Sequence, residues 1–233
     1  MSPTFEQIKA AYANKGYTFF SELKPYNLNI WGIRKLTDRV DVFDDIQGIS
    51  CKDDNGNIIH LIHPATVDPG FWYLKNQMLN PNGTFILAPG QYLGCWEKAM
   101  HKKHLALCQK DNYQKFKGWR DSKLDGVIQR KLTANGNFFM DVGGLDMHRS
   151  SETFASLVGK YSAGCQVRQV KTDHLKALEI VDKAIALYGN SFSYTLFDET
   201  DVFPNAVITR SRSANGELTK VWPGDFIQVE EKA

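Results

Sequence analysis

The segment DIQGISCKDDNGNIIHLIHP (residues 45–64) gives the clearest indication of the fold class of this 233-residue chain. Two strand-like runs flank Asp54-Asn55-Gly56, whose residues tolerate the positive φ angles of a tight hairpin turn. A third run of the same kind, LNIWGIRK (28–35), precedes them. The first half of the chain is therefore predicted to be predominantly β.

A helix is predicted to open the chain, ahead of this β region. Ser2 or Thr4 can cap it, Gln7 stands three residues after Thr4, and Gly16 follows its expected end. This spacing is typical of a capping box at a helix N-terminus.

Two more helices are predicted further along the chain. One covers TDHLKALEIVDKAIALYG (172–189), opened by Thr172 or Asp173 and closed by Gly189. The other runs from Trp96 to about residue 110, where apolar residues recur at helical spacing.

Strands are predicted to resume at DGVIQRKL (125–132) and NGNFFMDV (135–142), and strand-like pieces follow between Val207 and Val229. No linker, repeat or low-complexity segment divides the chain. We therefore expect one mainly β domain with peripheral helices (α+β). Its expected parts are an N-terminal helix and lead-in (1–27), a catalytic domain (28–190) and a C-terminal extension packed on the same domain (191–233).

Charge and composition exclude several functional classes. The net charge of +2, from 28 basic and 26 acidic residues, lacks the excess needed to neutralise a phosphate backbone, so nucleic acid is not an expected partner. Glu6 and Gln7 stand where a secretory signal needs an unbroken apolar core, and no stretch reaches the roughly 18 apolar residues of a membrane span. We expect synthesis in the cytoplasm without an export signal.

Cysteine and histidine spacings give no metal signature. The four cysteines form no CxxC pair and are expected to be free thiols, three of them structural (Cys51, Cys95 and Cys108). The pairs His101–His104 and His60–His63 each offer two ligands but lack a convincing third, so neither a metal nor another cofactor is expected.

The segment MHRSSETFASLVGKYSAGCQVR (147–168) carries the strongest chemical signal. A thiol has an unperturbed pKa of about 8.5 and reacts only with help from a base or positive potential, so His148 is the expected base for Cys165. Gly164 and Ala163 permit a tight turn in which a backbone N–H faces an acyl oxygen, and a helix start after Cys165 would add further N–H groups. Cys165 is thus predicted to be the nucleophile of an acyl-transfer enzyme.

These residues resemble the signature of L,D-transpeptidase (YkuD-type) catalytic domains, in the variant form found in phage and prophage proteins. That signature is His-Gly, a spacer, then Ser/Thr-His-Gly-Cys. His148, Ser162, Gly164 and Cys165 match it, whereas Arg149 and Ala163 replace the family's glycine and second histidine. The resemblance covers roughly residues 28–190 and implies a β-sandwich-like domain with its nucleophile at the mouth of a groove.

The resemblance also implies a substrate, the stem peptides of peptidoglycan. Cys165 would attack the carbonyl of an L-configured centre and form a thioester, with hydrolysis favoured for the phage-like variant. The carboxylates of the stem point to Arg149 as a substrate contact, because a guanidinium can bind a carboxylate with two hydrogen bonds. Ser162, Arg168 and Tyr161 complete the expected substrate-binding set.

Three matters stay open at this level. His148 needs an orienting partner, and Asp146, Ser150 or a backbone carbonyl can serve. Trp96 is a further candidate for the groove, although a buried aromatic is its ordinary role. The alternatives to a wall hydrolase, which would be released by host lysis or carried by a virion, are a cross-linking L,D-transpeptidase and an inactive wall-binding or virion-structural module.

Overall fold

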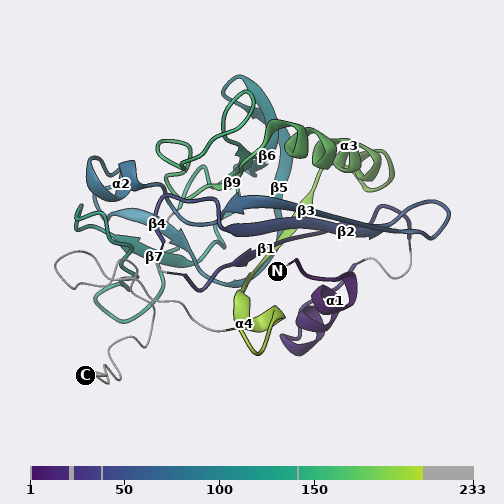
Figure 1. Ribbon diagram of the computed structural model, residues 1–233, viewed down its shortest axis with the longest axis horizontal. Coiled ribbons are helices and arrows are strands. Elements are labelled where there is room, and N and C mark those ends of the chain that lie inside the picture. Colours follow the sequence, from purple (N-terminus) through teal and green to yellow (C-terminus); the bar gives the residue numbers. More distant parts are fainter. Residues whose placement is uncertain (1, 21–23, 38, 141, 207–233) are drawn as a thin grey trace.

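The computed structural model describes residues 2–20, 24–37, 39–140 and 142–206 of the chain. Eight strands form one closed barrel, and a separate two-stranded sheet lies beside it with a short helix (Figure 1). The mainly β character with peripheral helices is confirmed. The strand-like pieces predicted between Val207 and Val229 lie outside the described residues.

The barrel takes strands from both ends of the described chain. In spatial order they are β1 (Asn29–Arg34), β10 (Phe192–Asp198), β5 (Gly90–His101), β6 (His104–Gln109), β8 (Met147–Arg149), β9 (Gln166–Arg168), β3 (Ile58–Thr66) and β2 (Asp45–Lys52). Two neighbouring pairs, β1–β10 and β8–β9, are parallel, and the other pairs are antiparallel. This single closed sheet does not support the predicted sandwich. It also contains β10, which comes from the segment expected to be an extension.

The hairpin predicted at residues 45–64 is present. β2 and β3 pair from Asp45↔Ala65 to Lys52↔Ile58, and Gly56 has a φ of 81° in the turn. Gly48 in β2 lies against Trp31, whose ring would be 2.1 Å from an added Cβ, so only glycine fits between the two strands.

The helix predicted from Trp96 to about residue 110 is wrong. Residues 90–109 form the β5–β6 hairpin, which pairs from Trp96↔Gln109 to His101↔His104 and turns at Lys102, whose φ is 55°. Leucine, alanine and lysine are good helix formers, but such preferences differ by less than about 1 kcal/mol per residue, and here β5 gains a second partner in β10 on its other edge. Pairing on both edges overrides the local preference.

The smaller sheet joins β4 (Thr84–Leu87) to β7 (Gly118–Asp121), and α2 (Phe71–Lys75) lies next to it (Figure 1). The strands predicted at 125–132 and 135–142 are not regular strands. Each supplies a single bridge to β7, through Lys131 and Phe139. Gly136 does turn the chain between them, with a φ of 74°.

The predicted helices at both ends of the described chain are confirmed. α1 (Phe5–Asn14) has the capping box of Thr4 and Gln7. α3 (Lys171–Tyr188) ends at Gly189 as expected, but Val170, rather than Thr172 or Asp173, is its N-cap. A short α4 (Glu199–Val202) follows β10 and contacts α1.

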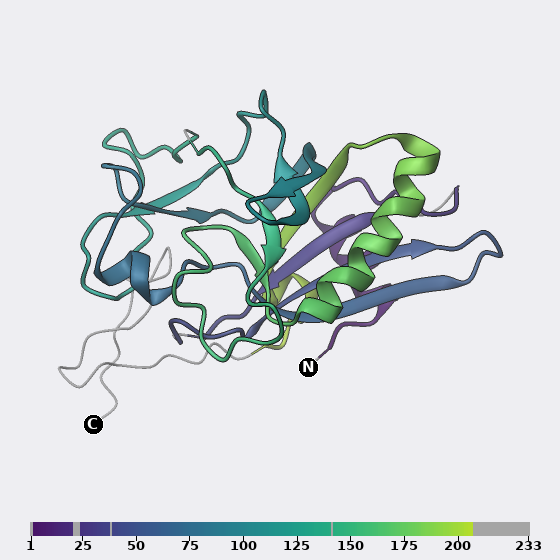
Figure 2. The same ribbon diagram turned by 90° about the horizontal axis from the view of Figure 1, so that it is seen from above.

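α3 helps to fill the main core. It runs alongside the barrel strands (Figure 2), and its residues Ala177, Val181 and Ala184 join the same buried cluster as Met147 of β8 and Tyr194 of β10. α1 packs in a second cluster, against β1 and β10. Within the described ranges, no helix combines the length and apolar character needed to cross a membrane.

Candidate active site

Strands β8 and β9 bring His148 and Cys165 together. The two strands are parallel, with His148 level with Val167, and Cys165 stands two residues before Val167. Because side chains alternate along a strand, residues two apart share a face, and register partners share it too. Asp146, His148 and Cys165 therefore lie on one face of this strand pair.

This face opens into a cavity of about 310 Å³ between the barrel and the smaller sheet. Both His148 and Cys165 line it. The opposite wall comes from α2, β4 and β7, and the loops 142–145 and 160–163 complete it. The charged residues at its wall are Lys102, Arg120 and Lys160, and none of the described residues that line it is acidic.

The turn before Cys165 is built by Ser162 and Gly164. The Ser162 hydroxyl donates to the Cys165 carbonyl at 2.8 Å and accepts the Gly164 N–H at 3.2 Å. Gly164 has a φ of 127°, and an added Cβ would lie 2.7 Å from the carbonyl oxygen of Phe85 in β4. Only glycine suits this position, so the turn before Cys165 packs closely against the smaller sheet.

The tight turn that Gly164 was expected to permit is present, whereas the helix start expected directly after Cys165 is not. The Gly164 N–H is already donated to Ser162. β9 follows Cys165, so α3 begins only at Lys171 and its free N–H groups are not next to the sulfur.

Cys165 is a half-buried thiol whose Sγ lies 3.5 Å from the carbonyl oxygen of Gly144. Burial raises its pKa to about 12, and the carboxylate of Asp146 acts in the same direction. A backbone hydrogen bond at Asp146 and the charge of Lys102 oppose this rise in pKa. The resting sulfur is therefore protonated at neutral pH, so its reaction requires a base.

The His148 ring is held in the tautomer that such a base requires. Its Nδ1 lies 2.7 Å from the carbonyl oxygen of Arg149 and donates its proton there, which leaves Nε2 to accept one. Burial lowers the pKa of His148 to about 4, so the ring is neutral at pH 7. Of the three orienting partners considered from the sequence, the structure shows the backbone carbonyl. Ser150 instead donates to the Gln169 carbonyl.

Asp146 orients a different histidine. His101, at the end of β5, places Nδ1 2.7 Å from Asp146 Oδ2, while Asp146 Oδ1 accepts the Gln109 N–H at 2.8 Å. The His101 ring stacks on His148, with ring centres 4.3 Å apart and planes 10° from parallel. The site thus contains two imidazoles, each oriented by its own acceptor.

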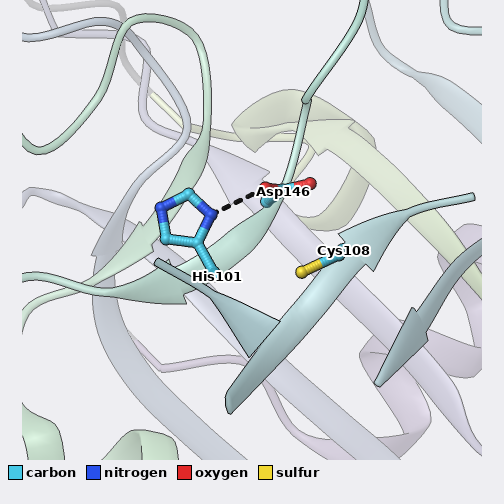
Figure 3. A group of neighbouring side chains, drawn as sticks. All are labelled: His101, Cys108 and Asp146. Carbon is cyan, nitrogen blue, oxygen red and sulfur yellow. Dashed lines mark hydrogen bonds and ion pairs between the residues drawn. The ribbon is translucent and has the colours of Figure 1, made fainter. Parts of the chain in front are cut away.

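Cys108 lies beside this pair, and Figure 3 shows its sulfur on the same side of the His101 ring as Asp146. The candidate ligand atoms of His101, Cys108 and Asp146 all lie within 4.8 Å of one another. These donor types can bind zinc, but two ligands on one tetrahedral zinc ion stand about 3.3 Å apart. The 2.7 Å contact between His101 and Asp146 is instead that of a hydrogen-bonded pair.

Three of the residues expected to bind substrate do not line the cavity. Arg149 is paired with Glu152 of its own loop. Arg168 is fully buried and contacts His174 and the sulfur of Met147. Ser162 is fully buried in the turn before Cys165. Their placement in the structure gives them internal partners in place of a substrate.

Tyr161 does line the cavity and is 39% exposed. Trp96 takes its ordinary role, since it is fully buried and donates to the Leu145 carbonyl at 2.7 Å. The sequence interpretation missed His101, Lys102 and Lys160 as cavity residues. The first two were hidden by the helix predicted there, and nothing near Lys160 in the sequence indicates that it lies close to Cys165.

The four cysteines are free thiols, as expected. No family model, no curated protein and no solved structure matches the chain.

Proposed function

We propose that this chain is a cysteine-dependent acyl-transfer enzyme that hydrolyses an L,D-peptide bond in the stem peptides of peptidoglycan. One observation carries the proposal: parallel strands β8 and β9 place a thiol and a neutral, oriented imidazole at the wall of one cavity. The relation to L,D-transpeptidase catalytic domains, and action on a cell wall after host lysis or from a virion, are parts of this proposal.

The first chemical step would be thioester formation. The gap between a thiol pKa of about 12 and an imidazole pKa of about 4 disfavours a preformed thiolate–imidazolium pair. His148 Nε2 therefore takes the proton as Cys165 Sγ attacks the acyl carbon. The proton then passes to the leaving amine as the C–N bond breaks.

Positive charge in the cavity supports a substrate that carries carboxylates. Lys102 and Lys160 line the wall, and the Lys160 ammonium lies 3.7 Å from the centre of the Trp72 ring. Arg120 is held in place, since its guanidinium donates to the Gly83 carbonyl at 2.6 Å. Stem peptides carry several carboxylates, which these cations would attract.

The test is incubation of the purified chain with muropeptides and analysis of the products by mass. We expect a shortened stem or a released D-amino acid from the unmodified chain and none from Cys165→Ala. Cys108→Ala is the matched control, because this half-buried thiol of β6 does not line the cavity.

A joined muropeptide dimer in this assay would show that the enzyme is a transpeptidase. If Cys165→Ala gave the same product as the unmodified chain, the nucleophile would be another group. No product from a folded, unmodified chain would contradict the proposed activity.

A further inference from the structure

The pair formed by His101 and Asp146 has no part in the thioester step described above. Asp146 directly precedes β8, and its backbone carbonyl accepts the N–H of Gln166, the residue after Cys165, at 2.9 Å. Its carboxylate is fixed by the Gln109 N–H on one oxygen and holds His101 with the other. His101 lines the cavity with Cys165 and His148.

Asp146 also sets which nitrogen of His101 can react. The carboxylate accepts the Nδ1 proton, so Nε2 carries the lone pair. Figure 3 shows this second nitrogen on the side of the ring away from Asp146 and Cys108. His101 is therefore an oriented proton acceptor within the cavity wall.

The two stacked histidines differ in what supports their positive form. His148 donates to a neutral carbonyl, whereas His101 donates to a carboxylate. A carboxylate stabilises the imidazolium that forms when the ring takes a proton. The two rings thus have different acceptors, and pairs of groups with such different surroundings usually divide acid and base roles.

We propose that His101, positioned by Asp146, is the general base that activates water to hydrolyse the Cys165 thioester. Water gives up its proton less readily than a thiol, so it needs an oriented base whose positive form a carboxylate can stabilise. The inference rests on the proposed function, because it assigns the second half of the same reaction. It also gives a reason for the preference for hydrolysis over cross-linking.

The step balances without another reactant. The water oxygen bonds to the thioester carbonyl carbon while one water proton moves to His101 Nε2. The C–S bond then breaks, and the proton returns to the leaving sulfur. The product departs as a carboxylic acid, and the enzyme is left with a free thiol and two neutral imidazoles.

The experiment measures the two half-reactions separately with purified muropeptides. Quenched samples of the unmodified chain, His101→Gln and His104→Gln are analysed by intact-protein mass to follow the thioester. We expect His101→Gln to form the thioester at the normal rate and to lose it about 100-fold more slowly. His104→Gln is the control, because His104 lies on the same hairpin but does not line the cavity.

Two further measurements keep the test decisive. Hydroxylamine attacks thioesters without a general base, so it should restore release of the acyl group in His101→Gln. Asp146→Asn leaves the imidazole in place and should slow release at least tenfold, and it tests the inference if His101→Gln fails to fold in a thermal unfolding assay.

The outcomes separate this inference from the proposed function. Failure of the unmodified chain to form a thioester or a product would contradict both. Normal turnover by His101→Gln, or a loss of thioester formation in it, would overturn the role of His101 alone.

Discussion

The two faces of the β8–β9 strand pair differ in chemistry although both are formed by alternate residues of the same two strands. On the cavity face, His148 and the adjacent Cys165 are polar groups that line an open space. On the core face, Met147 is fully buried in the main core, and the Gln166 side chain accepts a hydrogen bond from the hydroxyl of buried Tyr194 at 2.8 Å. The strand alternation therefore separates a reactive surface from a stabilising one within a few ångströms.

Burial has different consequences on the two faces. Burial of Met147 removes apolar surface from water and stabilises the fold. Burial of His148 lowers its pKa to about 4, so the ring is neutral at pH 7 and one ring nitrogen can still accept a proton. Substitutions on one face should change mainly the reaction, and those on the other mainly the stability.

The largest expected effect is on the cavity face. His148→Gln removes the proposed base for the thiol proton, so thioester formation should slow by about 10²- to 10⁴-fold. The rate is measured from the growth of the acyl-enzyme mass in quenched samples. A rate within threefold of normal would mean that another group takes the proton.

The next effect belongs to the core face. Met147→Ala leaves a void among fully buried residues and should lower the free energy of unfolding by about 2–5 kcal/mol. Urea unfolding measures the change. If the variant were as stable as the unmodified chain, the two faces would not differ in the way proposed.

A smaller effect is expected at the turn that connects the cavity face to the smaller sheet. Gly164→Ala would place a Cβ 2.7 Å from the Phe85 carbonyl at a φ of 127°, so it should lower stability by about 1–3 kcal/mol and displace Cys165. Gly143→Ala is the control in the same cavity wall, because its added Cβ would meet no atom within 4 Å. Equal thermal unfolding of both variants would count against the close fit of the turn.

The smallest expected effect is a dependence of stability on pH, at His174, which contacts Arg168 of β9. Burial lowers the pKa of His174 in α3 to about 3, below its ordinary value of 6.5, so the folded chain resists the protonation that the unfolded chain accepts. The stability contributed by the neutral ring is complete above pH 6.5 and is lost as the pH falls toward 3. At pH 5.5 this loss is about 1 kcal/mol.

His174→Gln removes this titration but keeps a group that can donate and accept hydrogen bonds. Its free energy of unfolding should therefore decline less than that of the unmodified chain between pH 7 and 5.5. Parallel declines in chemical denaturation would show that His174 does not carry this part of the acid sensitivity.

The parts of the fold that could be predicted are those with strong local signals. The capping box of Thr4 and Gln7 satisfies free N–H groups within one turn, so its sequence is nearly sufficient to start α1. The Asp54-Asn55-Gly56 turn likewise specifies the β2–β3 hairpin. The β5–β6 hairpin was missed because its stability comes from pairing with β10, almost a hundred residues away.

The candidate site divides in the same way. The pairing of His148 with Cys165 was predicted because both lie in one short segment with small residues at the turn. The roles of Arg149, Ser162 and Arg168 could not be predicted, because each depends on which face of its strand or turn is buried. His101 joins the site only because β6 pairs with both β5 and β8, which brings the end of β5 close to β8.

Local sequence signals were enough to predict that the chain is mainly β, where its first hairpin turns, where its first and last long helices lie and which cysteine has a histidine nearby. These features depend on turn, cap and spacing preferences that act over a few residues. Tertiary packing was needed to close the sheet into a barrel, to orient His148 with a backbone carbonyl and to bring His101, held by Asp146, to the cavity that Cys165 lines. These arrangements depend on the pairing of strands far apart in the chain, because each strand is placed by its neighbours rather than by its own residues.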